Sequence, residues 1–142
     1  MTTSRLPEKL AVDANPILSA VIGGSALKGF RDPRLSLCTT VHTVGEVLEY
    51  LPKLAQRAGI PIQEALASLY LLPLTPHGRP FYRSKIAKAS KLIGDRDPDD
   101  VDLLALALKL KIPIWTNDKD FEDAGIATYT TAQLLSLLNK AR

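Results

Sequence analysis

The sequence predicts an α/β protein with a central parallel β-sheet flanked by helices on both faces. Short aliphatic runs alternate along the chain with longer segments in which apolar residues recur at helical spacing. The short runs are continuously apolar, which is typical of strands buried on both faces. Strands that are separated by helices pair in parallel, because each helical crossover returns the chain to the same end of the sheet.

The size and composition fit one globular domain over residues 1–142, with residues 1–7 and the extreme C-terminus as candidate disordered segments. Hydrophobic residues make up 46% of the 142 residues, enough to form a core without disulfides. The single cysteine, Cys38, excludes an internal disulfide and favours a reducing compartment. The chain has no signal-peptide core and no apolar run near the roughly 20 residues that span a bilayer. We therefore expect a cytoplasmic protein with no membrane association.

The first half of the chain is expected to contain two strands and three helices. The predicted strands are 10–12 and 36–40, and the predicted helices are 14–22, 41–57 and 61–72. Residues 23–34 contain three glycines, one proline and mixed charges, which predicts a loop. Pro52 lies inside the second helix, so we expect a kink or a break there.

The second half is expected to supply two more strands and three helices. A turn at His77-Gly78 precedes a helix over 81–93. The other expected elements are a helix over 98–110, strands over 112–116 and 126–129, and a helix over 131–140. Pro113 must lie at the start of its strand or on an edge, because it cannot donate to a ladder of hydrogen bonds. Thr130 or Thr131 is expected to cap the last helix.

Acidic residues follow two of the predicted strands. Asp13 directly follows the first strand, and Asp118 follows the strand that contains Trp115. Sites in open parallel sheets form at the carboxyl ends of strands. Glu46 lies near the start of the second helix, and several further acids begin the helix over 98–110. We therefore expect carboxylates from four segments to meet at one edge of the sheet.

The acids near this last helix form a dense cluster. Its members within eight residues are Asp95, Asp97, Asp99, Asp100 and Asp102. One of them is expected to cap the helix, but so many like charges are unfavourable without a counter-ion. Carboxylates without histidine or cysteine partners suit Mg²⁺ or Mn²⁺. His42 and His77 lack zinc-ligand spacing, which argues against a zinc site.

The acids and their neighbours resemble the motifs of PIN domains. Asp13-Ala14-Asn15 resembles the opening Asp-x-Asn of that family, and Glu46 within 43–48 resembles its second acid. Asp100 and Asp118 lie 18 positions apart, similar to the third and fourth acids of VapC-type toxins. The most specific stretches are 96–108 and 114–121, and the resemblance covers roughly residues 10–138.

The resemblance implies a PIN-like domain that uses a metal ion to cleave single-stranded or structured RNA. It also implies the toxin component of a type II toxin–antitoxin system, with a small antitoxin protein as partner and a homodimeric state. The implied catalytic and metal-binding residues are Asp13, Glu46, Asp100 and Asp118, with Asn15 and Thr116 as polar supports. A slip of one residue at the start of this helix would change which acid points inward. Asp99 and Asp102 are therefore possible substitutes for Asp100.

Basic residues dominate the segment after the turn at His77-Gly78. Residues 79–91 contain five basic side chains and no acid. Four of them are expected to bind the RNA backbone: Arg79, Arg83, Lys85 and Lys88. The alternative is that they form an ordinary solvated helix face. The surrounding region, 58–92, is expected to form the variable helices that set substrate and partner.

Two other functions are compatible with the same acids. The first is a Mg²⁺-dependent phosphoryl-transfer domain, such as a receiver or a phosphatase, which also places acids at strand ends. Asp13 is not followed by a second acid two residues later, and no lysine follows the last strand in a clear pairing position. The second is a non-catalytic PIN-like module that binds RNA or a protein partner.

Overall fold

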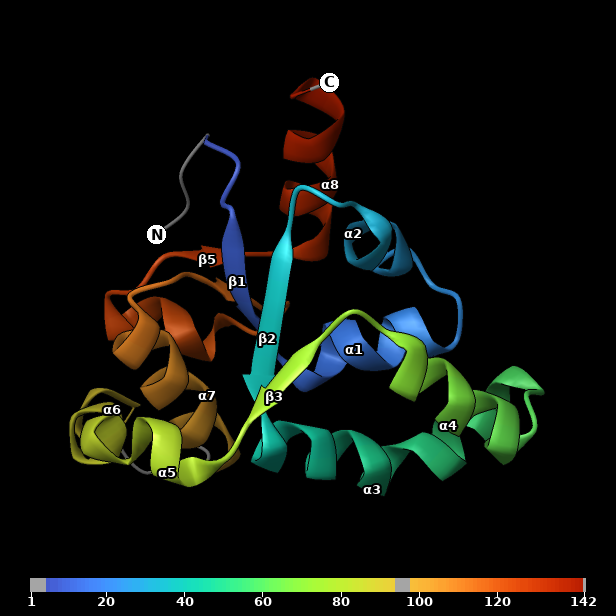
Figure 1. The fold of residues 1–142 in the computed structure, drawn as a ribbon, viewed down its shortest axis with the longest axis horizontal. Coiled ribbons are helices and arrows are strands. Elements are labelled where there is room, and N and C mark those ends of the chain that lie inside the picture. The colour runs from blue at the N-terminus through green and yellow to red at the C-terminus, as the bar shows by residue number, and fades with distance from the viewer. Residues whose placement is uncertain (1–4, 94–97, 142) are drawn as a thin grey trace.

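Five parallel strands form the centre of the molecule, in the order β3-β2-β1-β4-β5 (Figure 1). The structure is a computed structural model that describes residues 5–93 and 98–141. The strands are β1 (Lys9–Val12), β2 (Ser36–Thr40), β3 (Thr75–His77), β4 (Ile114–Trp115) and β5 (Thr128–Tyr129). The predicted α/β fold with a parallel sheet is confirmed.

Helices cover both faces of this sheet. They are α1 (Ala14–Val21), α2 (Leu27–Arg31), α3 (Val41–Ala58), α4 (Ile62–Leu71), α5 (Arg79–Tyr82), α6 (Ile86–Ile93), α7 (Pro98–Leu110) and α8 (Thr131–Lys140). Two short 3-10 helices, η1 (Arg83–Lys85) and η2 (Lys119–Ala124), join them. Leu10 and Val12 of β1 pack with α1–α4 and α8, whereas Ala11 between them packs with α5–α7. Successive side chains of a strand point to opposite faces of the sheet, so β1 contributes to two separate hydrophobic cores.

The expected loop over 23–34 is wrong in part, because it contains α2. Phe30 of this helix is 2% exposed and its ring centroid lies 5.1 Å from that of the fully buried Trp115. Gly29 lies directly against the same indole, since a Cβ there would be only 2.6 Å from Trp115 Cη2. The glycine that indicated a loop therefore serves a close contact between helix and sheet.

Three further expectations are corrected by the structure. The helix expected over 81–93 is divided into α5, η1 and α6, and α5 already begins at Arg79. The segment before it, which was expected to be only a turn, forms the edge strand β3 beside β2. α3 runs through Pro52 as one helix, so of the kink or break expected there the break does not occur. Pro113 immediately precedes β4, as expected, and its carbonyl accepts a hydrogen bond from Ala11 N at 3.0 Å.

Cys38 lies in the core beneath α7, and burial raises the pKa of its thiol. None of the helices in the described parts of the chain is long and apolar enough to cross a membrane. Residues 1–4 of the predicted disordered segment, and Asp95 and Asp97 of the acidic cluster, lie outside the described residues.

Candidate active site

Two neighbouring strands deliver Asp13 and Thr116 to the same edge of the sheet. β1 and β4 are paired in parallel, so the residues that follow them emerge side by side. Asp13 Oδ1 accepts from Ala14 N at 2.8 Å and thereby caps α1. Its Oδ2 accepts from Thr116 Oγ1 at 2.7 Å. The carboxylate is thus held at both oxygens.

The Thr116 hydroxyl also holds the loop that carries Asp118. Thr116 is 1% exposed, and its Oγ1 accepts from Asp118 N at 3.0 Å. Asp118 in turn caps η2, because its Oδ1 accepts from Asp120 N at 2.9 Å. One buried hydroxyl therefore links the acid after β1 to the acid after β4.

The third acid comes from the first turn of α7. Asp100 is 6% exposed, unlike most aspartates, which face solvent. One carboxylate oxygen from each of Asp100, Asp118 and Asp120 lies within 4.8 Å of the others. From its place in the sequence, Asp120 is most simply a turn or surface residue, with metal contact as the minor alternative. Its position two residues after Asp118, in the tight turn of η2, brings it into this group.

Glu46 reaches the site on the second turn of α3. This helix starts immediately after β2, where Thr40 Oγ1 accepts from Thr43 N at 2.8 Å and pairs with Thr43 Oγ1 at 2.7 Å. The hydroxyl pair is buried and fixes the direction in which α3 leaves the sheet. Glu46 is half-buried on this helix and faces the same edge as the other acids.

These side chains surround one pocket of about 720 Å³. The predicted residues that line it are Asp13, Asn15, Glu46, Asp100 and Asp118. The pocket is also lined by Tyr50, Asn117 and Lys119, which are not among the predicted site residues. Tyr50 lies one helical turn beyond Glu46, and Lys119 directly follows Asp118, so spacing from the predicted acids would have found both.

The three neighbouring aspartates of α7 have different surroundings. Asp99 Oδ1 lies 2.8 Å from His42 Nε2 at the exposed start of α3. Asp102 is 2% exposed, accepts from the Tyr82 hydroxyl, and receives two hydrogen bonds from Arg79 at 3.2 and 3.3 Å. Of the three, Asp100 is the one that lines the acidic pocket.

The contacts of Asp102 raise the pKa values of its two partners. Burial first, and then the hydrogen bond to Asp102, raise the pKa of Tyr82, so its hydroxyl stays protonated and donates. The same carboxylate raises the pKa of Arg79. Asp102 is therefore occupied in joining α7 to α5.

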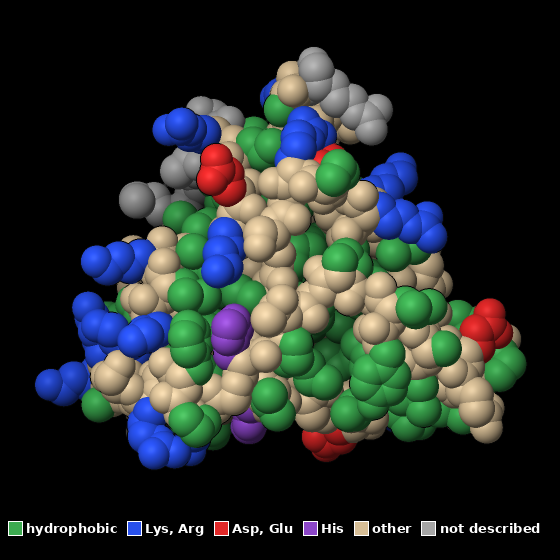
Figure 2. All heavy atoms as spheres, in the orientation of Figure 1, with side chains coloured by type: hydrophobic (Ala, Val, Ile, Leu, Met, Phe, Trp, Pro, Cys, Tyr) green, Lys and Arg blue, Asp and Glu red, His purple; other side chains and the backbone are tan. Residues whose placement is uncertain are grey.

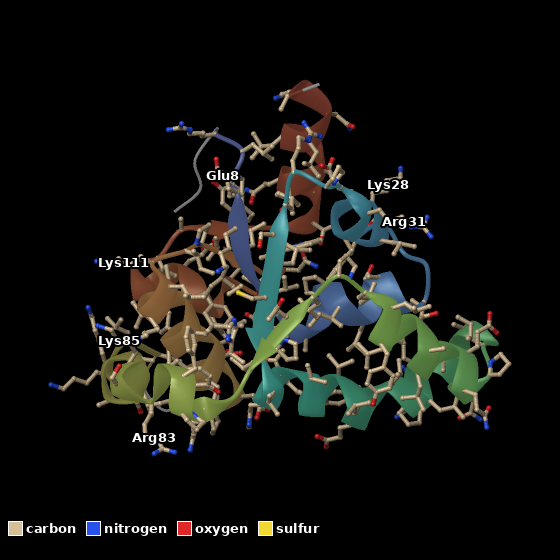
Figure 3. The ribbon with its side chains drawn as sticks, in the orientation of Figure 1. Glu8, Lys28, Arg31, Arg83, Lys85 and Lys111 are labelled. Atoms are coloured by element: carbon tan, nitrogen blue, oxygen red, sulfur yellow. The ribbon has the colours of Figure 1, made fainter. Side chains whose placement is uncertain are left out.

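The basic residues expected to bind RNA lie outside this pocket. Arg83 and Lys85 of η1 point outward from the edge of the molecule (Figure 3), and Lys88 is exposed on α6. Lys and Arg side chains gather over this part of the surface, around α5 and α6 (Figure 2). Arg79 binds Asp102, yet 58% of its side chain remains exposed.

The donor set of the pocket fits a hard divalent cation. Its ionisable ligands are carboxylates from four segments of the chain, and the described residues that line it include no histidine or cysteine. Such an all-oxygen set suits Mg²⁺ or Mn²⁺, and a cation would offset the repulsion between these clustered charges.

A family model for the PIN domain matches residues 11–139 of the chain. A search of curated proteins found no match. PIN domains are typically nucleases that depend on divalent metal ions, and the acidic pocket at the carboxyl edge of the sheet is compatible with such a site. The match spans nearly all of the sheet and its helices. This chain belongs to the PIN-domain family.

Proposed function

We propose that this protein is a Mg²⁺- or Mn²⁺-dependent endoribonuclease whose catalytic site is the acidic pocket. Asp13, Glu46, Asp100 and Asp118 are the proposed metal ligands and catalytic residues. The observation that carries the proposal is the position of these four carboxylates, which come from four separate segments and line one pocket. Membership of a family of nucleases supports it.

Each side chain has a defined part in this proposal. The carboxylates hold the ion, which when bound activates water and stabilises the charge on the phosphate. The Thr116 hydroxyl keeps the carboxylate of Asp13 and the loop of Asp118 in fixed positions. Asn15, at the exposed rim, supports the site, and Lys119 provides a positive charge for the RNA backbone.

The RNA strand is proposed to extend from the pocket over the basic residues beside it. The proposed contacts are Arg79, Arg83, Lys85 and Lys88, on α5, η1 and α6. Their charges lie where Lys and Arg side chains gather on the surface (Figure 2), which suits a polyanion. The proposed substrate is single-stranded or structured RNA.

The resemblance to VapC-type toxins extends the proposal to a cytoplasmic toxin with a small antitoxin and a homodimeric state. α4 carries two large apolar side chains at the surface, Tyr70 at 73% and Leu71 at 83% exposure. Exposed apolar residues of this size are typical of protein interfaces when they gather in one patch. Light scattering of the purified protein tests the dimer, and co-purification with the protein of an adjacent reading frame tests the antitoxin.

Removal of the metal is expected to stop RNA cleavage. Mn²⁺ titrated by calorimetry into the protein should bind saturably, and a pool of cellular RNA should be cut only when the ion is present. Full cleavage in EDTA would contradict the proposal. Metal binding without cleavage of any RNA would favour a non-catalytic module, and an acid-labile phosphate adduct from a small phosphodonor would favour a phosphoryl-transfer domain.

Thr116→Val is expected to weaken Mn²⁺ binding by about 10- to 100-fold, the usual cost of losing a group that orients metal ligands. The substitution keeps the shape of the side chain but removes its hydrogen bonds with Asp13 and Asp118. Calorimetric titration with Mn²⁺ measures the effect.

Thr39→Val is the matched control for this change. The Thr39 hydroxyl is equally buried and donates to the backbone oxygen of Val12 at 2.7 Å, but it has no hydrogen bond with an acid of the pocket. The two variants should lose similar stability, whereas only Thr116→Val should lose affinity for Mn²⁺. Equal affinities in both variants would show that the Thr116 hydroxyl does not position the ligands.

A further inference from the structure

A stacked pair of rings lies at the surface outside the acidic pocket. His77, the last residue of β3, and Phe81 of α5 have ring centroids 4.5 Å apart and planes inclined by 18°. Phe81 is 41% exposed. Burial, and then the charge of Lys9, lower the pKa of His77, so its ring is neutral at neutral pH. The pair therefore presents a partly exposed aromatic surface.

One lysine lies over these rings, and further lysines line a nearby groove. The Lys109 amino group lies over Phe81, 5.8 Å from the ring centroid. A groove of about 400 Å³ lies against the same end of α7, and its lining includes Lys85, Lys88 and Lys111. The described residues that line this groove include no acid. Lys109 directly follows Leu108, which lines the groove, so the rings and the groove both lie near the C-terminal end of α7.

Figure 3 places two of these lysines, Lys85 and Lys111, along one side of the molecule. Lys85 and Lys111 point outward from the same edge, whereas Lys28 and Arg31 of α2 lie on the opposite edge (Figure 3). Figure 2 shows Lys and Arg side chains gathered on that first edge. We call His77, Phe81, Lys85, Lys88, Lys109 and Lys111 the ring-and-lysine surface.

We propose that the ring-and-lysine surface binds an unpaired stretch of the RNA substrate, with a base stacked on Phe81 and phosphates held by the lysines. The proposal rests on the proposed ribonuclease function. Exposed aromatic rings beside cations are the combination that holds single strands, because every base has a face that stacks. An acidic protein segment would use the lysines, but it would gain little from the rings.

The surface lies at a distance from the acids. Lys109 lies nine positions after Asp100 in α7, which corresponds to about 14 Å along the helix axis. A strand that occupies both sites must therefore continue beyond the cleaved bond. The substrate class that follows is an RNA with a single-stranded segment adjoining the cleavage position, in preference to a continuous duplex.

The test measures binding of a short labelled single-stranded RNA by fluorescence anisotropy, in EDTA so that no cleavage occurs. Phe81→Ala should weaken binding about tenfold, the scale of one lost base stack, with an unchanged salt dependence. The double variant Lys109→Gln with Lys111→Gln should lower the slope of log affinity against log salt by about 1.4, as two phosphate contacts require.

The matched control is Lys28→Gln with Arg31→Gln, which removes the same charge from the opposite edge. It should bind RNA like the wild-type protein. Phe81 and Lys109 are exposed, so both test variants should fold, as circular dichroism would verify. Normal binding by Phe81→Ala would overturn the proposal, as would equal losses in the two charge variants. Duplex RNA bound as tightly as single-stranded RNA would also overturn it.

Cleavage of the same RNA with Mn²⁺ separates this proposal from the proposed function. If the wild-type protein cleaves but the variants bind normally, the ring-and-lysine surface is refuted and the ribonuclease stands. If the variants lose binding as expected but no protein cleaves this RNA or any RNA in a cellular pool, the ribonuclease is refuted and the RNA-binding surface stands.

Discussion

Asp100→Asn is expected to abolish metal-dependent RNA cleavage while the protein stays folded. Asp100 is the buried acid of α7 that lines the acidic pocket, and one of its oxygens lies within 4.8 Å of oxygens of Asp118 and Asp120. The amide keeps the size of the side chain but removes the charge that the ion requires. The loss of rate should be about 100- to 1000-fold, because a catalytic metal contributes several kcal/mol.

The same substitution should leave thermal stability in EDTA unchanged or slightly higher. Without a metal the clustered carboxylates repel each other, and removal of one charge relieves that repulsion. Calorimetric Mn²⁺ titration and unfolding curves measure the two effects separately. Asp99→Asn is the control, since Asp99 contacts His42 at the surface. A loss of cleavage in Asp99→Asn with normal activity in Asp100→Asn would reassign the metal-facing acid.

Asp102→Ala, in contrast to Asp100→Asn, is expected to cause a large loss of thermal stability. Asp102 is 2% exposed and accepts hydrogen bonds from Tyr82 and Arg79. Truncation removes the charged acceptor from a buried hydroxyl and separates α5 from α7. The expected cost is about 3 kcal/mol, the upper end of the range for losing a hydrogen bond to a charged group and leaving a buried hydroxyl without its acceptor. Thermal unfolding in EDTA should occur roughly 10 °C lower.

Two further variants distinguish the loss of these Asp102 contacts from a general effect of removing an acid. Asp102→Asn keeps an acceptor for Tyr82 but loses the ion pair with Arg79, so it should recover part of the stability. Asp99→Ala removes an exposed partner of His42, which should cost at most about 1 kcal/mol. Equal melting temperatures for Asp102→Ala and Asp99→Ala would show that the contact between α5 and α7 does not stabilise the fold.

The sequence indicated where the acids lie, because strand ends and helix starts are local features. Asp13 and Asp118 follow apolar runs directly, and the bounds of α7 follow from its acids and its continuous apolar stretch. The structure brings these segments to one pocket as expected. What the sequence left open was the direction of each aspartate in α7.

That direction depends on distant partners. Asp99 contacts a residue 57 positions away, and Asp102 contacts Tyr82, 20 positions away. No local pattern contains such contacts, so only the tertiary structure separates them from Asp100. The ring pair was missed for the same reason. It requires β3 at the edge of the sheet, whereas the sequence pattern predicted a turn and one continuous helix.

The hydrogen bond between Thr116 and Asp13 bears on when the acidic pocket forms during folding. It joins residues 103 positions apart, at the ends of two strands that pair in the middle of the sheet. During synthesis Asp13, Glu46 and Asp100 all leave the ribosome before Thr116 and Asp118 do. Contacts between such distant segments form late in folding. A nascent chain therefore lacks the complete acidic pocket, which forms only after β4 has docked beside β1.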